Sequence, residues 1–262
     1  MEVHHKWRQL GYRHVTWELL RYYLSIRGER NQHQWLEELK RTHSVTAESA
    51  KFPLPHEAIS NFFEYLRLRE TEFEVIFSKL RDEKSATKYC DENAIQFGTT
   101  VTKNSDHHQA SKALVATVSA IASEECSRRG ISIDPNPQTR CTWHSDRGLH
   151  VTARNLDGAI PSTVNPIIVW EIKEYWGKTS GGSKMSDAVY ECNLVGRELR
   201  DFEQQTGLSV VHAVFVDGKD QWTARKADLR RLIDLTYQGL IDFLFVGREV
   251  EDEWRAKLCE LL

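Results

Sequence analysis

No apolar run in this sequence is long enough to form a membrane-spanning helix, although 40% of its 262 residues are hydrophobic. A secretion signal is also missing, because the chain starts with MEVHHKWRQ and no apolar segment or cleavage site follows. We therefore expect a cytoplasmic protein with no membrane partner. Its length predicts one large domain, or a core domain with a smaller one appended.

Metal-binding and disulfide-forming cysteine patterns are missing as well. None of the five cysteines forms a Cys-x-x-Cys motif, and they lie apart at positions 90, 126, 141, 192 and 259. This odd number and this spacing predict neither a zinc site nor a disulfide framework. Reduced thiols in a cytoplasmic protein are the better interpretation.

The chain also has no excess of positive charge, since its formal net charge is −3 at pH 7. This balance does not predict nucleic-acid binding. It does not exclude it either, because phosphate contacts depend on local patches and a nuclease needs acidic metal ligands. The glycine-rich segment 176–184 lacks the G-x-x-x-x-G-K-S/T spacing, which argues against hydrolysis of nucleoside triphosphates.

What the sequence does contain is a charged pair inside an apolar, β-favouring segment that runs from Pro166 to Lys173. A segment this hydrophobic predicts a strand buried on both faces. Because side chains alternate between the faces of a strand, Glu171 and Lys173 share one face. Burying a carboxylate and an ammonium group is costly unless they are paired or bind an ion. Asp157 precedes a glycine and a proline that can turn the chain back, so it can lie beside Glu171 on a neighbouring strand.

Three other acid-x-Lys triplets occur in the chain, at residues 38–40, 82–84 and 217–219. The first two have no aspartate upstream, and the third falls on an Asp-Gly turn signal. Only the triplet at 171–173 combines a buried strand with an aspartate within hairpin range. Two carboxylates and a lysine at one end of a sheet are the groups needed to hold Mg²⁺ and to activate a water molecule.

The pattern of Asp157, thirteen intervening residues and then Glu171-Ile172-Lys173 resembles the PD-(D/E)XK nuclease superfamily, the fold of most type II restriction endonucleases. The resemblance covers roughly residues 108–247, and it departs from the family at Leu156, where a proline often precedes the aspartate. It implies an α/β (α+β) fold with a mixed central sheet flanked by helices. It also implies a Mg²⁺-dependent, sequence-specific endonuclease acting on double-stranded DNA, with Mn²⁺ able to replace Mg²⁺.

The resemblance implies roles for the residues of this pattern. Asp157, Glu171 and Lys173 would be catalytic. The metal would be held by Asp157, Glu171 and the backbone carbonyl of Ile172. Lys173 would orient or deprotonate the attacking water, or donate to the phosphate, and the sequence does not choose between these roles.

In nuclease folds of this type a glutamate on the helix before the catalytic hairpin often joins the metal site. The helix predicted over residues 111–129 has an apolar stripe whose spacing continues to Glu125. Glu125 is therefore the candidate for this role, with its neighbour Glu124 as the alternative. A helix-end acid that reaches water is the competing interpretation.

Helical periodicity without chemistry-bearing motifs predicts a helical N-terminal region over residues 1–88. The polar segment 89–107 predicts a linker or an ordered loop. Alternating buried strands and helices over residues 108–262 predict the catalytic domain, with helices on both faces of the sheet.

Candidate DNA contacts are basic residues in loops or on helix surfaces. The segment 176–184 has the composition to bring backbone N–H groups and lysines close to phosphates. The candidates are Arg147, Lys178, Lys184, Arg225, Arg230 and Arg231.

Two other functions stay open. A DNA repair or structure-specific nuclease would have the same site but would require a nick, an end or a mismatch. A non-catalytic DNA-binding protein would use Glu171 and Lys173 only as a structural ion pair. The recognition sequence cannot be read from the chain, because base contacts come from loops with no transferable code. The sequence also leaves the oligomeric state open, and it is compatible with a monomer or a homodimer.

Overall fold

The computed structural model describes residues 5–47, 50–100, 110–177 and 182–262. Its helices are α1 (His5–Leu10), α2 (Val15–Ser25), α3 (Glu29–Thr42), α4 (His56–Lys79), α5 (Glu83–Glu92), α6 (Ala113–Arg129), α7 (Gly182–Thr206), α8 (Lys219–Ala224), α9 (Lys226–Tyr237), α10 (Glu249–Asp252) and α11 (Trp254–Leu261). Its strands are β1 (Ser44–Ala47), β2 (Ala50–Pro53), β3 (Thr142–Ser145), β4 (Gly148–Val151), β5 (Gly158–Ile160), β6 (Ile168–Glu174), β7 (Val211–Asp217) and β8 (Phe243–Val246). The fold is of the mixed α+β class. None of the described helices is both long and apolar enough to cross a membrane.

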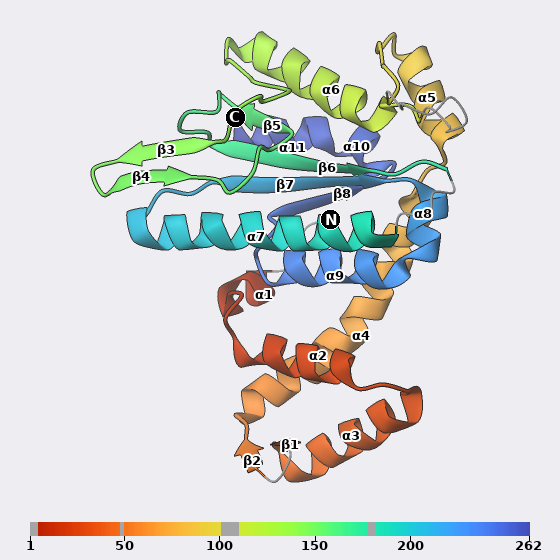
Figure 1. The fold of residues 1–262 in the computed structure, drawn as a ribbon, viewed down its shortest axis with the longest axis vertical. Helices are drawn as coiled ribbons and strands as arrows, with labels where there is room; N and C mark the ends of the chain where they lie inside the picture. The colour runs from red at the N-terminus through yellow and green to blue at the C-terminus, as the bar shows by residue number, and fades with distance from the viewer. Residues whose placement is uncertain (1–4, 48–49, 101–109, 178–181) are drawn as a thin grey trace.

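A four-stranded sheet in the order β5-β6-β7-β8 lies at the centre of the larger part of the molecule (Figure 1). β5 is antiparallel to β6, whereas β6, β7 and β8 are parallel to one another. The parallel strands need crossover connections, which α7 and the α8–α9 pair provide. β6 is therefore an inner strand, and its hairpin partner β5 forms the edge.

Helices cover both faces of this sheet, as Figure 1 shows. On one face α6 and α11 pack together, and Trp254 of α11 contacts Trp170 and Phe215. On the other face α7 and α9 form one apolar cluster with residues of β7 such as Val214. Because side chains alternate along a strand, Trp170 faces α6 and α11, while Glu171 faces α7.

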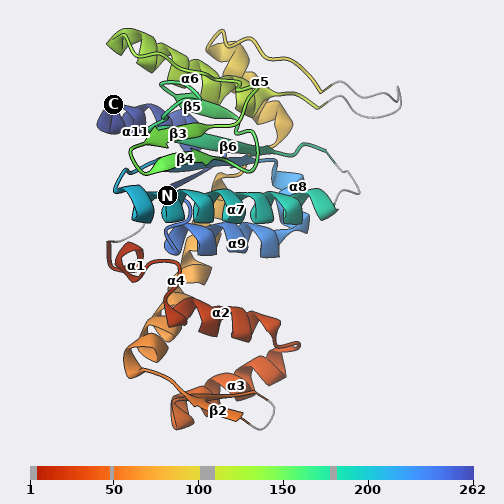
Figure 2. The same ribbon diagram turned by 60° about the vertical axis from the view of Figure 1, so that its left-hand side comes forward.

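The long helix α4 joins the N-terminal part of the chain to the sheet (Figure 2). It packs against α2 and also against α9. Arg69 of α4 donates to the Asp234 carboxylate of α9 over 2.7 and 2.9 Å, and the Tyr65 hydroxyl donates to the same carboxylate over 2.7 Å. All three side chains are buried. A buried ion pair therefore holds the two parts of the molecule together.

Asp234→Ala is expected to lower the free energy of unfolding by about 3–5 kcal/mol, because it leaves the buried Arg69 guanidinium without its main partner. Arg21→Ala is the matched control, since it breaks an ion pair with Glu18 that is exposed on α2 and should change stability little. Urea unfolding of both variants measures the difference. Equal stability of the two variants would show that the Arg69–Asp234 pair does not hold the parts together.

The N-terminal half differs from the prediction in two places. Strands β1 and β2 pair antiparallel within a region predicted to be helical. The helix α5 continues to Glu92. The domain boundary predicted at residue 88 and the start of the linker predicted over 89–107 are therefore wrong, because both fall inside this helix. This helix forms despite its polar sequence because Asp82 caps it, accepting the Ser85 N–H over 2.7 Å, and because Ala86 and Cys90 are buried against α6.

In the C-terminal half the predicted elements are present with shifted ends. β3 and β4 pair antiparallel, and α6 ends where Gly130 adopts a left-handed conformation with φ 66°. α7 begins at Gly182, so the end of the glycine-rich segment 176–184 lies in this helix rather than in a loop.

Candidate active site

The candidate site lies on β6, on the face that α7 covers. Glu171 and Lys173 are almost completely buried there, with exposed fractions of 1% and 3%. Lys173 Nζ donates to Glu171 Oε2 over 2.8 Å. The alternation of side chains along the strand places both groups on one face, as the sequence predicts.

Asp157 lies beside Glu171, one residue before β5. Gly158 is opposite Trp170 in the antiparallel register, so the preceding residue continues toward Glu171. The Asp157 N–H donates to the Trp170 carbonyl over 3.0 Å, and its Oδ2 accepts the Ile172 N–H over 2.7 Å. Gly158 permits this close pairing, because a Cβ there would lie 1.8 Å from the Trp170 ring. The hairpin therefore brings the three residues of the sequence pattern together.

Two residues that the sequence pattern did not identify complete this charged group. Glu191 of α7 accepts a hydrogen bond from Lys173 Nζ over 2.7 Å through its Oε2. Arg154, from the segment between β4 and β5, also contacts Glu191 Oε2, and its Nη1 lies 2.9 Å from Glu171 Oε2. The side chains of Arg154 and Glu191 are 31% and 39% exposed. The site is thus buried around Glu171 and open to solvent on the side of Arg154 and Glu191.

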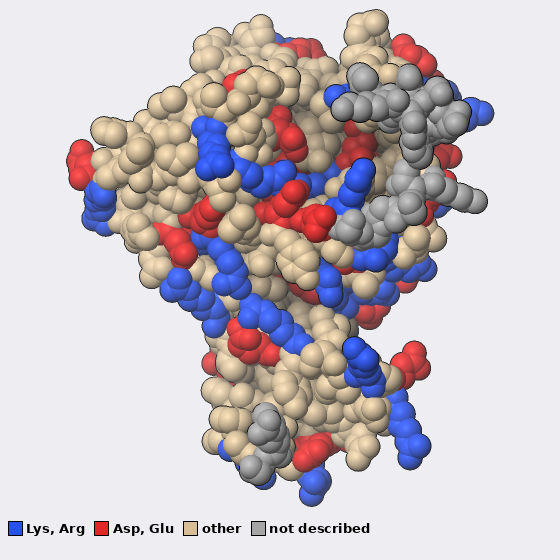
Figure 3. Space-filling model, in the orientation of Figure 1, with Lys and Arg blue, Asp and Glu red and all other residues tan. Residues whose placement is uncertain are grey.

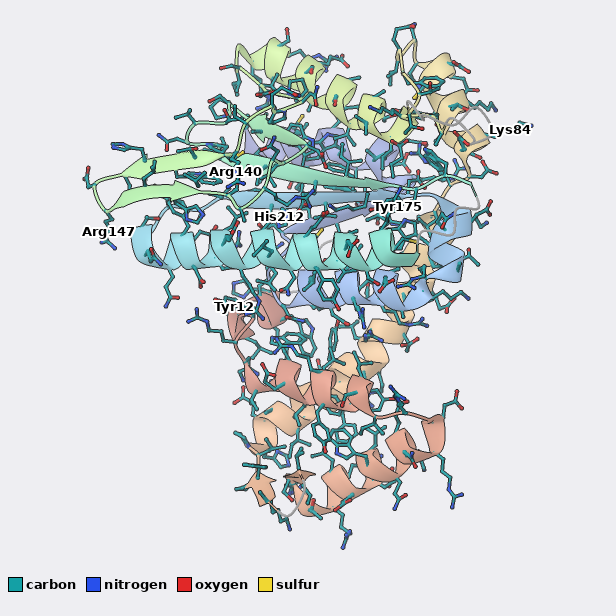
Figure 4. The ribbon with its side chains drawn as sticks, in the orientation of Figure 1. Tyr12, Lys84, Arg140, Arg147, Tyr175 and His212 are labelled. Atoms are coloured by element: carbon teal, nitrogen blue, oxygen red, sulfur yellow. The ribbon has the colours of Figure 1, made fainter. Side chains whose placement is uncertain are left out.

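His212 of β7 contacts the other oxygen of Glu171, and Figure 4 shows it between the sheet and α7. Its Nε2 lies 3.3 Å from Glu171 Oε1, and its Nδ1 lies 2.9 Å from the Leu240 carbonyl oxygen. The ring is fully buried and fixes the orientation of the Glu171 carboxylate.

The charges of the site shift the pKa values of its groups in different directions. Burial alone would raise the pKa of Glu171, but Lys173 and His212 outweigh it and hold the pKa at about 2. Burial alone would lower the pKa of Lys173, yet the Glu171 carboxylate raises it. Asp157 is partly exposed to solvent, but the surrounding protein desolvates its carboxylate enough to raise its pKa. Lys173 is therefore an ammonium group at neutral pH in this arrangement, and it can donate hydrogen bonds.

The oxygen atoms of this group fit a hard divalent cation such as Mg²⁺. Asp157 Oδ1 has no hydrogen-bond partner among the described residues, because only Oδ2 binds the Ile172 N–H. A strand residue directs its N–H and C=O to the same side, so the Ile172 carbonyl points toward Asp157. The oxygens of Glu171 and Glu191 are covered by cations, and no group of three metal-binding side chains is assembled within the described ranges. The donor set suits Mg²⁺ once a cation moves away from the glutamates.

The structure does not bring Glu125 to this site. Its side chain is buried on the inward face of α6, as the spacing predicts. There it accepts from Arg129 over 2.8 Å and from the Cys259 thiol over 3.3 Å. Glu124 pairs with Arg128 and Arg255 at the same end of α6. Both acids lie at the contact between α6 and α11, so the prediction that one of them joins Asp157 and Glu171 is wrong for this structure.

The predicted DNA contacts at the loops have different surroundings. Lys178 lies outside the described residues. Lys184 is exposed in the first turn of α7, and its carbonyl accepts from the Tyr175 hydroxyl over 3.4 Å. Arg147 is exposed at the β3–β4 turn and donates to the Gln205 carbonyl. Figure 4 shows Arg147 and Tyr175 at opposite ends of the sheet, so these candidates do not form one cluster.

The predicted DNA contacts near α9 are paired with acidic residues. Arg225 and Arg231 both contact the Asp228 carboxylate, and Arg230 contacts Glu70 of α4. On the face drawn in Figure 3, basic and acidic side chains are intermingled rather than gathered into one basic surface. These arginines therefore neutralise acids within the protein.

Glu174 lies on the face of β6 opposite Lys173 and yields a pH prediction. It accepts from the Leu114 N–H over 2.8 Å and from Trp176 Nε1 over 2.7 Å, yet burial raises its pKa from 4.5 to about 7. A carboxyl group whose pKa is raised by folding contributes stability below its unfolded pKa, and this contribution is lost as the pH rises through about 7. The melting temperature of Glu174→Gln minus that of the wild type should therefore rise as the pH increases from about 5 to about 8. A melting-temperature difference that does not vary with pH would contradict this assignment.

A hollow of about 520 Å³ lies elsewhere, between α5, α6 and α11. Its lining includes Tyr89, Gln96, Ser119 and Arg255. We place the candidate site at β6 instead, because buried charged groups with shifted pKa values converge there.

A family model described as a domain of unknown function (DUF7687) matches residues 69–261, from the middle of α4 to the end of α11. All residues of the candidate site lie inside this range. No significant match was found among curated proteins or among solved structures.

Proposed function

The chain belongs to the DUF7687 family, and from the geometry of its site we propose that it is a Mg²⁺-dependent endonuclease of the PD-(D/E)XK type that cleaves double-stranded DNA. The observation that carries this proposal is Asp157 beside Glu171 and Lys173 at the end of the β5–β6 hairpin. The order of α6, the hairpin, α7 and the parallel strand β7 supports a restriction-endonuclease-like fold.

Asp157, Glu171 and the Ile172 carbonyl would hold the metal, and Mn²⁺ should substitute for Mg²⁺. When bound, the cation would supply a water of lowered pKa and offset negative charge on the scissile phosphate. Lys173 stays protonated between two glutamates, so we assign it hydrogen-bond donation to the phosphate or to the attacking water. His212 keeps the Glu171 carboxylate oriented so that its Oε2 faces Lys173.

DNA would approach from the side on which Arg154 and Glu191 are exposed. We propose sequence-specific cutting of the restriction type. A repair or structure-specific nuclease with the same site would instead require a nick, an end or a mismatch in its substrate.

A non-catalytic DNA-binding function has one observation in its favour. The Glu171 carboxylate is already contacted by Lys173, Arg154 and His212. A buried carboxylate compensated in this way can be a structural feature only.

Incubating plasmid DNA of known sequence with the protein, in Mg²⁺ or in EDTA, tests the proposal and separates these functions. Cuts at one repeated sequence in Mg²⁺ alone support the restriction-type enzyme. Cuts only in nicked or mismatched substrates support a repair nuclease. DNA that is bound and never cut supports the non-catalytic function.

A further inference from the structure

Arg154 bridges the two glutamates of the candidate site. Its Nη1 lies 2.9 Å from Glu171 Oε2 and also contacts Glu191 Oε2. Lys173 Nζ binds the same two oxygens, at 2.8 and 2.7 Å. Two cations therefore cover the carboxylate oxygens that a divalent metal would need.

Of these two cations, only Arg154 is positioned to move away from the glutamates. Lys173 is 3% exposed and projects from the inner strand β6, whereas the Arg154 side chain is 31% exposed and comes from a connecting segment. A Lys173 ammonium that left the site would lose both of its carboxylate partners in a buried setting, which is strongly unfavourable. Arg154 can exchange its partners for water or another anion at the surface.

The backbone around Arg154 is held on both sides, so its side chain can move without the segment. The Ala153 N–H donates to Glu198 over 3.1 Å, and the Asn155 side chain donates to the Gln138 carbonyl over 3.2 Å. The guanidinium group is planar and presents a fork of N–H donors that matches a phosphate. A swing of this side chain would carry it from the glutamates to the solvent side, where DNA would lie.

We propose that Arg154 is an exchangeable counter-ion of the metal site. It holds Glu171 and Glu191 together while no metal is bound, yields their oxygens to the divalent cation, and then donates to a phosphate of the DNA. This inference rests on the proposed function. It makes Arg154 a positioning residue that couples metal binding to DNA binding, and it explains why no ready-made group of three ligands is present among the described residues.

Calorimetric titration of Mn²⁺ into the DNA-free protein tests the proposal. Arg154→Gln removes the competing charge, so it should bind the metal more tightly, by about 10-fold or more on the scale of changes around metal ligands. Arg154→Lys retains a positive charge and should bind the metal about as the wild type does. Arg147→Gln removes an arginine at the β3–β4 turn, away from the site, and should leave the Mn²⁺ affinity unchanged.

DNA affinity in Ca²⁺ is the second readout. Arg154→Gln should bind DNA more weakly. The slope of its log affinity against log salt concentration should decrease by about one, the contribution of one phosphate contact. If folded Arg154→Gln binds Mn²⁺ no more tightly than the wild type does, the counter-ion role is overturned, even if the wild type cuts DNA. Absence of both Mn²⁺ binding and cutting by the wild type overturns the proposed function, and the counter-ion role with it.

Discussion

Asp157→Asn is expected to reduce DNA cleavage by about 100-fold or more, on the scale of losing one preorganised electrostatic contact in an active site. Asparagine keeps the size of the side chain, and its carbonyl oxygen can still accept the Ile172 N–H. The fold should therefore persist while one negatively charged ligand is lost. Without metal the variant should bind DNA at least as well as the wild type, because it removes a negative charge that faces the phosphate. Cleavage rate, DNA affinity and melting temperature together measure this result.

Glu125→Gln is the matched control for Asp157→Asn. It removes a buried carboxylate charge from the same part of the chain, but this carboxylate binds Arg129 and Cys259 instead of the site. It should cut DNA at the normal rate with an unchanged Mg²⁺ titration. If Asp157→Asn is folded and cuts DNA as fast as this control, Asp157 has no role in catalysis.

Lys173→Ala should also abolish cutting, but with the opposite effect on DNA binding. It removes a buried positive charge, so metal-free DNA binding should weaken. The variant leaves Glu171 and Glu191 without the ammonium group between them. Its free energy of unfolding should fall by about 3–5 kcal/mol, the usual effect of removing one partner from a buried pair.

Lys40→Ala is a suitable control because it alters another acid-x-Lys triplet, at residues 38–40. Lys40 lies on α3 and forms an exposed ion pair with Glu37. Its replacement should leave cutting, DNA binding and stability nearly unchanged. If Lys173→Ala loses stability and still cuts DNA normally, the Glu171–Lys173 pair is structural.

Local rules were enough to predict the central strand and its hairpin. The alternation of side chains in β6 places Glu171 and Lys173 on one face, and the glycine after Asp157 allows β5 to approach Trp170 closely. These features depend on residues that are near one another in the sequence, so their pattern is visible there.

The remaining site residues come from separate elements, and no local pattern places them together. Arg154, Glu191 and His212 come from a connecting segment, from α7 and from β7, and they meet only after the crossover helix packs on the sheet. The position of His212 inside the apolar segment 208–216 was the one signal available for it in the sequence. Glu125 shows the converse error, since its inward spacing on α6 is correct but the helix packs it against α11.

Binding and cutting of the same DNA, compared in Mg²⁺, Ca²⁺ and EDTA, test the central claim most directly. The DNA should be unmethylated and long enough to contain every short recognition sequence. Ca²⁺ is larger than Mg²⁺ and tolerates irregular coordination, so it should support binding while activating water poorly. The wild type should therefore cut in Mg²⁺ alone and bind without cutting in Ca²⁺. Neither Asp157→Asn nor Lys173→Ala should cut at more than about a hundredth of the wild-type rate in any condition. Equal cutting in EDTA, or cutting at the wild-type rate by the folded variants, would contradict a metal-dependent hydrolytic site at Asp157, Glu171 and Lys173.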